Sequence, residues 1–144
     1  SPARAQACWA DTSVRAAQLR DLQTLMMVGA LRCRATADNL LDAYNGFISR
    51  HRALIQAHND QLKTHFGARN ISAYDRFTTA LANDHAGRTS AADFCARVRA
   101  LSERAAAAES VGALAAMAEA ETPAPRGVNA CTARPVTIAA VGPQ

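Results

Sequence analysis

The sequence predicts an all-α fold: an antiparallel bundle of four to five helices, an extended proline-containing C-terminal tail, and two disulfides. Alanine, the best helix former, fills 35 of the 144 positions, and aromatic residues make up only 5% of the chain. Apolar residues recur at helical spacing over long stretches. A chain of this length forms one domain. We therefore divide it into a helical bundle, residues 1–121, and a tail, residues 122–144, that packs on the bundle or on a partner.

The first helix is predicted to begin at one of residues 11–13 and to end near Arg34. Asp, Thr and Ser occupy the three starting positions, and each of these residue types can cap a helix. Leu22 and Met26 repeat at helical spacing along the predicted segment. Gly29 lies inside this helix, so it is either a weak point or a place where another helix comes close.

The second predicted helix has the longest apolar stripe in the chain. Thr36 or Asp38 caps its start, and Gly67 is a natural residue to follow its end. The apolar side chains repeat at intervals of three and four residues, as expected for one buried helix face: Leu40, Leu41, Tyr44, Phe47, Ile48, Leu54, Ile55, Leu62 and Phe66. The pattern therefore predicts one uninterrupted helix from residue 38 or so to Phe66.

Two further helices begin with similar capping signatures. Ser72 and Asp75 resemble a capping box that starts a helix ending at Gly87, and Ser90 and Asp93 repeat the signature for the next helix. The inward faces of these two helices are predicted to carry the following apolar residues: Tyr74, Phe77, Leu81, Phe94, Val98 and Leu101. Both helices therefore contribute to the core.

The chain changes character after its last helical piece. Ser110 or Gly112 interrupts the fourth helix, and from Thr122 onward recurrent prolines prevent a continuous helix. Cys131 anchors this tail, and Val136–Ile138 is a short run with β propensity. We therefore expect an extended tail rather than another helix.

The helix layout favours one of the three possible disulfide pairings. Short loops make consecutive helices antiparallel. Cys33, at the end of the first helix, then lies at the same end of the bundle as Cys95, at the start of the fourth. Cys8 precedes the first helix and Cys131 follows the last, so both lie at the opposite end. The predicted pairs are Cys33–Cys95 and Cys8–Cys131.

Composition indicates an exported protein without a membrane span. Four well-separated cysteines in a small chain are typical of an oxidising compartment. The residues Ala3–Ala7 have the small-residue character of signal-peptidase sites, so we expect the mature form of a periplasmic or secreted protein whose signal peptide has been removed. No apolar run approaches the roughly 20 residues of a transmembrane helix.

The positive charge does not predict nucleic-acid binding. The formal net charge is +4, and all but one of the basic residues are arginine. Several arginines occur in pairs two positions apart, which do not share a helix face: Arg32 and Arg34, Arg50 and Arg52, and Arg97 and Arg99. They do not form the basic stripe that a nucleic-acid partner requires.

A column of histidines is the most distinctive polar feature. His51, His58 and His65 are spaced by seven residues, and Tyr44 continues the series. Seven residues correspond to about 10.5 Å of helix rise, so no two of these histidines can bind one metal from a single helix. We interpret the series as a polar seam beside the core and a possible interface. If it meets a partner, acidification is expected to weaken the contact.

Function is predicted by class rather than by reaction. The sequence lacks nucleophile-elbow, phosphate-loop, dinucleotide and haem-attachment motifs, and we predict no catalytic residues, cofactor or metal. Trp9, the only tryptophan, either covers a disulfide or core edge or anchors an interface. The leading expectation is an exported interaction or structural module, a subunit of an envelope or extracellular assembly, which binds a protein partner or itself. The alternatives are a small-molecule carrier with an apolar cavity between helices and an enzyme of unknown class.

Overall fold

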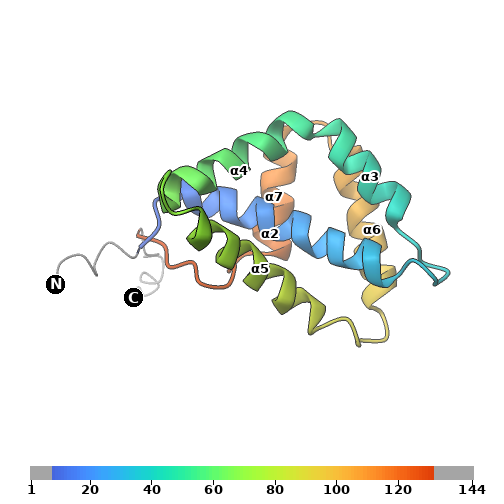
Figure 1. Ribbon diagram of the computed structural model, residues 1–144. Helices are drawn as coiled ribbons and strands as arrows, with labels where there is room; N and C mark the ends of the chain where they lie inside the picture. The colour runs from blue at the N-terminus through green and yellow to red at the C-terminus, as the bar shows by residue number, and fades with distance from the viewer. Residues whose placement is uncertain (1–7, 132–144) are drawn as a thin grey trace, which may run out of the picture.

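The structure is a computed structural model that describes residues 8–131. These residues form six helices and no β-sheet. The central helix is α2 (Asp11–Arg32), and each of the other five packs against it (Figure 1). These are α3 (Leu41–Arg50), α4 (Arg52–Phe66), α5 (Ile71–Ala86), α6 (Phe94–Ala107) and α7 (Val111–Glu121). The all-α class and the presence of two disulfides are confirmed. The described residues contain six helices, whereas four to five were predicted.

The additional helix arises because the long second helix is divided at His51. This residue has φ −110° and ψ 26°, outside the α-helical range, and separates α3 from α4. Both halves contact α2, but their other partners differ, because α3 packs chiefly on α6 and α4 packs on α5. A ring nitrogen of His51 lies 3.1 Å from the carbonyl oxygen of Ala105 in α6. The bend lets one apolar stripe follow the curved surface of the core.

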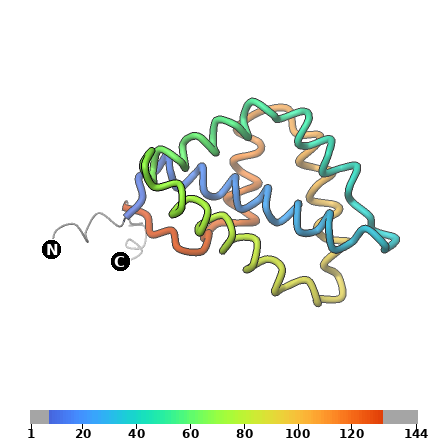
Figure 2. Tube along the Cα trace, in the orientation of Figure 1, coloured from blue at the N-terminus to red at the C-terminus, as the bar shows by residue number. Residues whose placement is uncertain are grey.

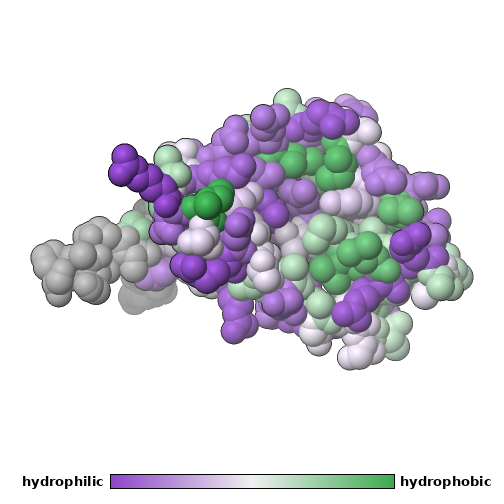
Figure 3. All heavy atoms as spheres, in the orientation of Figure 1, coloured by the Kyte–Doolittle hydropathy of each residue, from purple (hydrophilic) through white to green (hydrophobic). Residues whose placement is uncertain are grey.

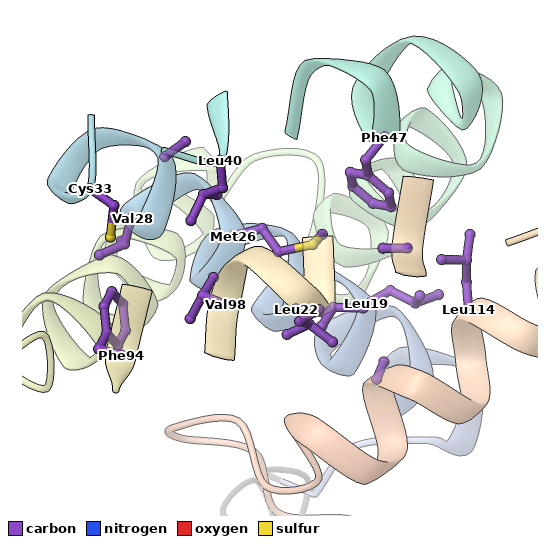
Figure 4. Packing of buried hydrophobic residues seen from close by; sticks show 14 residues of the cluster. Leu19, Leu22, Met26, Val28, Cys33, Leu40, Phe47, Phe94, Val98 and Leu114 are labelled. Carbon is purple, nitrogen blue, oxygen red and sulfur yellow. The ribbon is translucent and has the colours of Figure 1, made fainter. Parts of the chain in front are cut away.

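The core consists of two neighbouring clusters along α2. Figure 4 shows the larger one, in which Leu22 and Met26 of α2 lie near Val98 of α6. Its other buried members are Leu19, Val28, Ala30, Cys33, Leu40, Phe47, Phe94, Leu101, Ala105, Leu114 and Ala118. The smaller cluster is Trp9, Ala16, Ala17, Leu62, Tyr74, Phe77 and Leu81. Most of the residues predicted to face inward are therefore buried.

Gly29 marks a close helix crossing rather than a weak point. A Cβ added at this position would lie 2.8 Å from Cγ1 of Val98 and 3.3 Å from Cδ2 of Leu40. Any side chain larger than hydrogen would therefore collide with the neighbouring helix α6.

One of the described helices has a side-chain cap at its start, formed by a serine that the sequence predicts as a helix break and not as a cap. In α7, Ser110 is the N-cap, and its Oγ accepts a hydrogen bond from the backbone N–H of Ala113 at 3.0 Å. The N-caps of the other described helices make no side-chain capping bond, and Ser72 lies inside α5 rather than before it. The start of α2 at Asp11 agrees with the predicted range, but the capping roles predicted for residues 11–13, 36 or 38, 72 and 90 are wrong, because none of these residues is the N-cap of its helix.

The two disulfides connect the pairs that the helix layout predicts. Cys33 and Cys95 have Cα atoms 5.8 Å apart, and those of Cys8 and Cys131 are 4.7 Å apart. Beside the second bond, Trp9 N–H donates to the Asn129 carbonyl at 2.7 Å, and Cys131 N–H donates to the Trp9 carbonyl at 2.8 Å. The two ends of the described chain therefore lie together, as Figure 2 shows.

The segment from Thr122 to Cys131 lies on the helices. The Thr122 hydroxyl donates to the Gln18 carbonyl at 2.9 Å, and the Gln18 side-chain amide donates to the Pro123 carbonyl at 3.0 Å. The predicted β-type run Val136–Ile138 and the Ala3–Ala7 segment lie outside the described residues. In the part of the chain that is described, none of the helices has both the length and the apolarity to cross a membrane.

Candidate functional site

The residues of the predicted histidine seam do not share one exposed face. Trp9 and His58 are buried, whereas Tyr44, His51 and His65 are half-buried. Each makes contacts within the chain. The division of the helix at His51 also separates the series. Tyr44 lies on α3, whereas His58 and His65 lie on α4.

Trp9 and His65 form an aromatic stack at the end of the molecule where the described chain begins and ends. Their ring centroids are 3.8 Å apart with an interplanar angle of 25°, and Phe66 and Phe77 contact the same indole at 5.4 and 5.2 Å. Partial burial lowers the pKa of His65 below its usual value. Of the two roles predicted for Trp9, packing is the one that these contacts support.

His58 belongs to a buried polar network between α2, α3 and α4. Its Nε2 lies 3.4 Å from Oε1 of Gln23, and Gln23 also hydrogen-bonds to Tyr44. Burial, assisted by the positive charge of Arg20, lowers the pKa of His58 to about 4. His58 is therefore neutral at physiological pH. Burial also raises the pKa of Tyr44.

The network determines which nitrogen of His58 carries the proton. An amide oxygen only accepts hydrogen bonds, so neutral His58 places its proton on Nε2 and donates to Gln23. Nδ1 is then an acceptor. It is buried and has no hydrogen-bond partner among the described residues. A buried acceptor without a donor costs free energy, on the order of 1–3 kcal/mol.

His58 also lines an apolar groove between α2, α4 and α7, which we call the α7 groove. Its volume is about 250 Å³, and it is open to solvent. The lining residues are Thr12, Arg15, Ala16, Leu19, Leu54, Ala57, His58, Gln61, Val111 and Ala115. Val111, the first residue of α7, is 59% exposed at its edge. Most of this surface is aliphatic.

A second candidate site is a buried acid–histidine pair that the sequence analysis did not find. Asp21 of α2 and His85 of α5 are both buried, and His85 Nε2 lies 2.5 Å from Asp21 Oδ1. The pair borders a polar hollow of about 230 Å³ whose other lining residues are Asp84, Arg88, Glu121, Thr122, Pro123 and Ala124. Asp21 lies beside Arg20 in a helix that also contains Asp11, so its position carried no distinctive signal, and its partner is 64 positions away.

The described residues contain no free cysteine and no group of three or more histidine, cysteine or acidic side chains arranged to hold a metal ion. Figure 3 shows that apolar side chains on one face gather in separate patches among hydrophilic ones. We take the histidine network with the α7 groove and the Asp21–His85 hollow as the two candidate sites, because each combines a hollow with buried polar side chains.

Comparison of the chain with protein-family models, with curated proteins and with solved structures found no match. A function for this chain must therefore be argued from its own residues.

Proposed function

We propose that this protein is an exported helical interaction module, a subunit of an envelope or extracellular assembly, that binds a protein partner through the α7 groove. The observation that carries the proposal is the groove itself, an open and largely aliphatic surface with Val111 exposed at its edge. The two disulfides indicate an oxidising, extracytoplasmic environment. Periplasmic or secreted localisation is part of the proposal.

The chain offers a matched pair of exposed apolar residues for testing this proposal. Val111 and Ile71 are 59% and 54% exposed, and each is the first residue of its helix. Val111 lines the α7 groove, and Ile71 does not. A glutamate at either position lies in the first turn of a helix, where a negative charge is favourable. The two substitutions are therefore similar in their effect on folding and differ in their effect on the groove.

The test compares wild-type protein, Val111→Glu and Ile71→Glu as immobilised baits in the extracellular fraction of the source cells. A partner is a protein retained by wild type and Ile71→Glu and lost with Val111→Glu. After purification, its affinity measured by calorimetry should fall at least about tenfold with Val111→Glu alone, which corresponds to about 1.4 kcal/mol. The proposal would be contradicted if the purified partner bound both variants with equal affinity. It would also be contradicted if no protein were retained by wild type and Ile71→Glu.

A second candidate function, an enzyme, is favoured by the Asp21–His85 pair. A buried carboxylate that hydrogen-bonds one nitrogen of a histidine fixes the tautomer and orients the ring as a general base. The pair borders a polar hollow that a small substrate can enter. Turnover of a panel of nitrophenyl esters should then fall strongly in His85→Gln. Equal turnover by wild type and a folded His85→Gln protein would remove this candidate.

A further inference from the structure

The helix α7 is apolar on sides that the described chain does not cover. Residues 111–118 include no polar or charged side chain, yet only Leu114 and Ala118 of this helix are buried. The helix packs chiefly on α2. A helix with apolar residues all round is normally enclosed by other elements. The uncovered part of α7 is therefore suited to contact with another protein.

Two hollows border α7 and join into one surface, which we call the α7 face. The α7 groove is the first, and the second is an open hollow of about 550 Å³ along α2 and α7. Arg15 and Ala115 line both hollows, so the two are continuous. Gly112 and Ala116 add further apolar lining to the second hollow.

The charged residues of the α7 face have opposite signs and no ion-pair partners. Arg15 and Glu119 are exposed and line the second hollow, together with Asp11. None of these three residues forms an ion pair with another described residue. Protein interfaces are arranged so that such charges meet opposite ones across the contact. The occupant of the α7 face must therefore bring charges of both signs.

A second copy of this chain supplies those charges. In a two-fold symmetric contact the same surface occurs twice, so that residue i of one copy meets residue j of the other, and j meets i. A surface that is complementary to itself must carry both signs, as Arg15 and Glu119 do. A two-fold axis between them places Arg15 of each copy opposite Glu119 of the other and covers the hollow that both line. Asp11 lies in the first turn of α2, where its charge is favourable without a partner.

From these observations we propose that the partner of the α7 face is a second copy of this chain. The dimer is two-fold symmetric, with apolar contact along α7 and two ion pairs between Arg15 and Glu119 of opposite copies. This inference rests on the proposed function and names the partner. Exposed ion pairs contribute little affinity, so the apolar contact holds the dimer and the ion pairs select its partner and orientation.

The first test is the molar mass in solution, measured by sedimentation equilibrium without reductant at pH 7.5 and low salt. The mass of wild type should rise from that of one chain towards twice that value between about 1 µM and about 1 mM protein. Arg15→Glu and Glu119→Arg each place like charges at both contacts, so the dissociation constant should increase about tenfold or more. Arg52→Glu is the control, because Arg52 is exposed on α4 and lines neither hollow. It changes the net charge as Arg15→Glu does and should associate like wild type.

A mixture of the two charge-reversed variants tests the symmetric arrangement. When Arg15→Glu is mixed with Glu119→Arg, opposite charges meet again at both contacts, so a heterodimer should form with about the affinity of wild type. An ion pair within one chain would not be restored by mixing, because each variant would still carry two like charges. Circular dichroism and urea unfolding establish that each variant is folded.

Wild-type protein that keeps the mass of one chain throughout would overturn the inference. So would unchanged association of both charge-reversed variants, or a mixture that associates no better than its components. These results leave the comparison of Val111→Glu with Ile71→Glu as baits unaffected. A monomeric protein that retains a different partner through Val111 would refute the dimer and support the proposed function, so the two failures are distinguishable.

Discussion

Two histidines, one buried and one half-buried, have lowered pKa values in the folded protein. His58 accepts a proton poorly in the folded state, because its ring is desolvated and the positive charge of Arg20 on α2 acts against a second cation. His65, stacked on Trp9, has a pKa lowered in the same direction by partial burial. Both side chains are free to take up protons in the unfolded chain near pH 6.5.

The free energy of unfolding is therefore expected to fall as pH decreases from about 6.5 towards 4. In this interval the unfolded state binds a proton at His58 that the folded state excludes, so stability is complete above pH 6.5 and is lost below it. The contribution of His58 is on the order of 3 kcal/mol. Urea unfolding of wild type and His58→Gln at pH 7.5 and 4.5 measures it.

His58→Gln removes the titrating ring, so its stability should depend less on pH than that of wild type. His65→Gln is the comparison, and it should remove a smaller part of the dependence because its ring is only half-buried. Identical pH slopes for wild type and His58→Gln would show that burial does not depress the pKa of His58 in solution.

Helix packing depends on how closely the central helix approaches its neighbours. At Gly29 of α2, the side chains of Val98 and Leu40 occupy the space where a Cβ would lie. At Gly46 of α3, the nearest atom to an added Cβ is Cβ of Ala106, at an ordinary contact distance of 3.8 Å. The packing around Gly29 therefore leaves no room for a Cβ, whereas the packing around Gly46 does.

Alanine substitution at these two positions should change stability in opposite directions. Gly46→Ala should stabilise the protein by up to about 1 kcal/mol, since alanine loses less backbone entropy than glycine in a helix. Gly29→Ala gains the same propensity but forces Val98 and α6 to shift, so we expect a net loss of about 1–2 kcal/mol. Thermal unfolding of both variants measures the difference. Stabilisation by Gly29→Ala would contradict the close crossing.

The bend between α3 and α4 shows a limit of sequence patterns at the scale of elements. Ile48 and Ile55 are seven residues apart, as on one helix face, and neither proline nor glycine lies between them, although the intervening residues 50–52 are polar. The helix nevertheless ends and restarts there, because α3 lies chiefly on α6 while α4 lies on α2 and α5. Periodicity reports which residues are buried and carries no information about which neighbour buries them.

The whole molecule is closed by two long disulfide loops. Cys8 and Cys131 are 123 positions apart, and Cys33 and Cys95 are 62 apart. The first bond encloses every described helix. It also secures the backbone pairing of Trp9 with the segment that ends at Cys131.

Removal of either disulfide should destabilise the protein strongly. Loop-entropy arguments give about 5 kcal/mol for the longer loop and about 4 kcal/mol for the shorter one, as upper values. Urea unfolding of Cys8→Ser/Cys131→Ser and of Cys33→Ser/Cys95→Ser measures both. In hydrogen exchange, the first double variant should also lose protection at the amides of Trp9 and Cys131, which the second should retain. A loss below about 1 kcal/mol in both would show that the helices alone hold the fold.

Sequence patterns alone predict the helical class, most of the core, a helix break near Ser110 or Gly112 and the pairing of the four cysteines. These follow from local properties: alanine content, spacing of apolar residues, and the alternation of helix direction that short loops impose. They needed no knowledge of which side chains meet across the molecule.

The tertiary structure decided the bend at His51, the helix starts without caps, the Asp21–His85 pair and the α7 groove with its unsatisfied His58 nitrogen. The two histidine contacts join side chains far apart in the chain: His58 and Gln23 are 35 positions apart, and His85 and Asp21 are 64 positions apart. Local propensities differ by about 1 kcal/mol or less per residue. Burying an apolar side chain stabilises the fold by more than that, and burying an unpaired polar group destabilises it by more than that. Long-range packing therefore overrides local propensities where the two conflict.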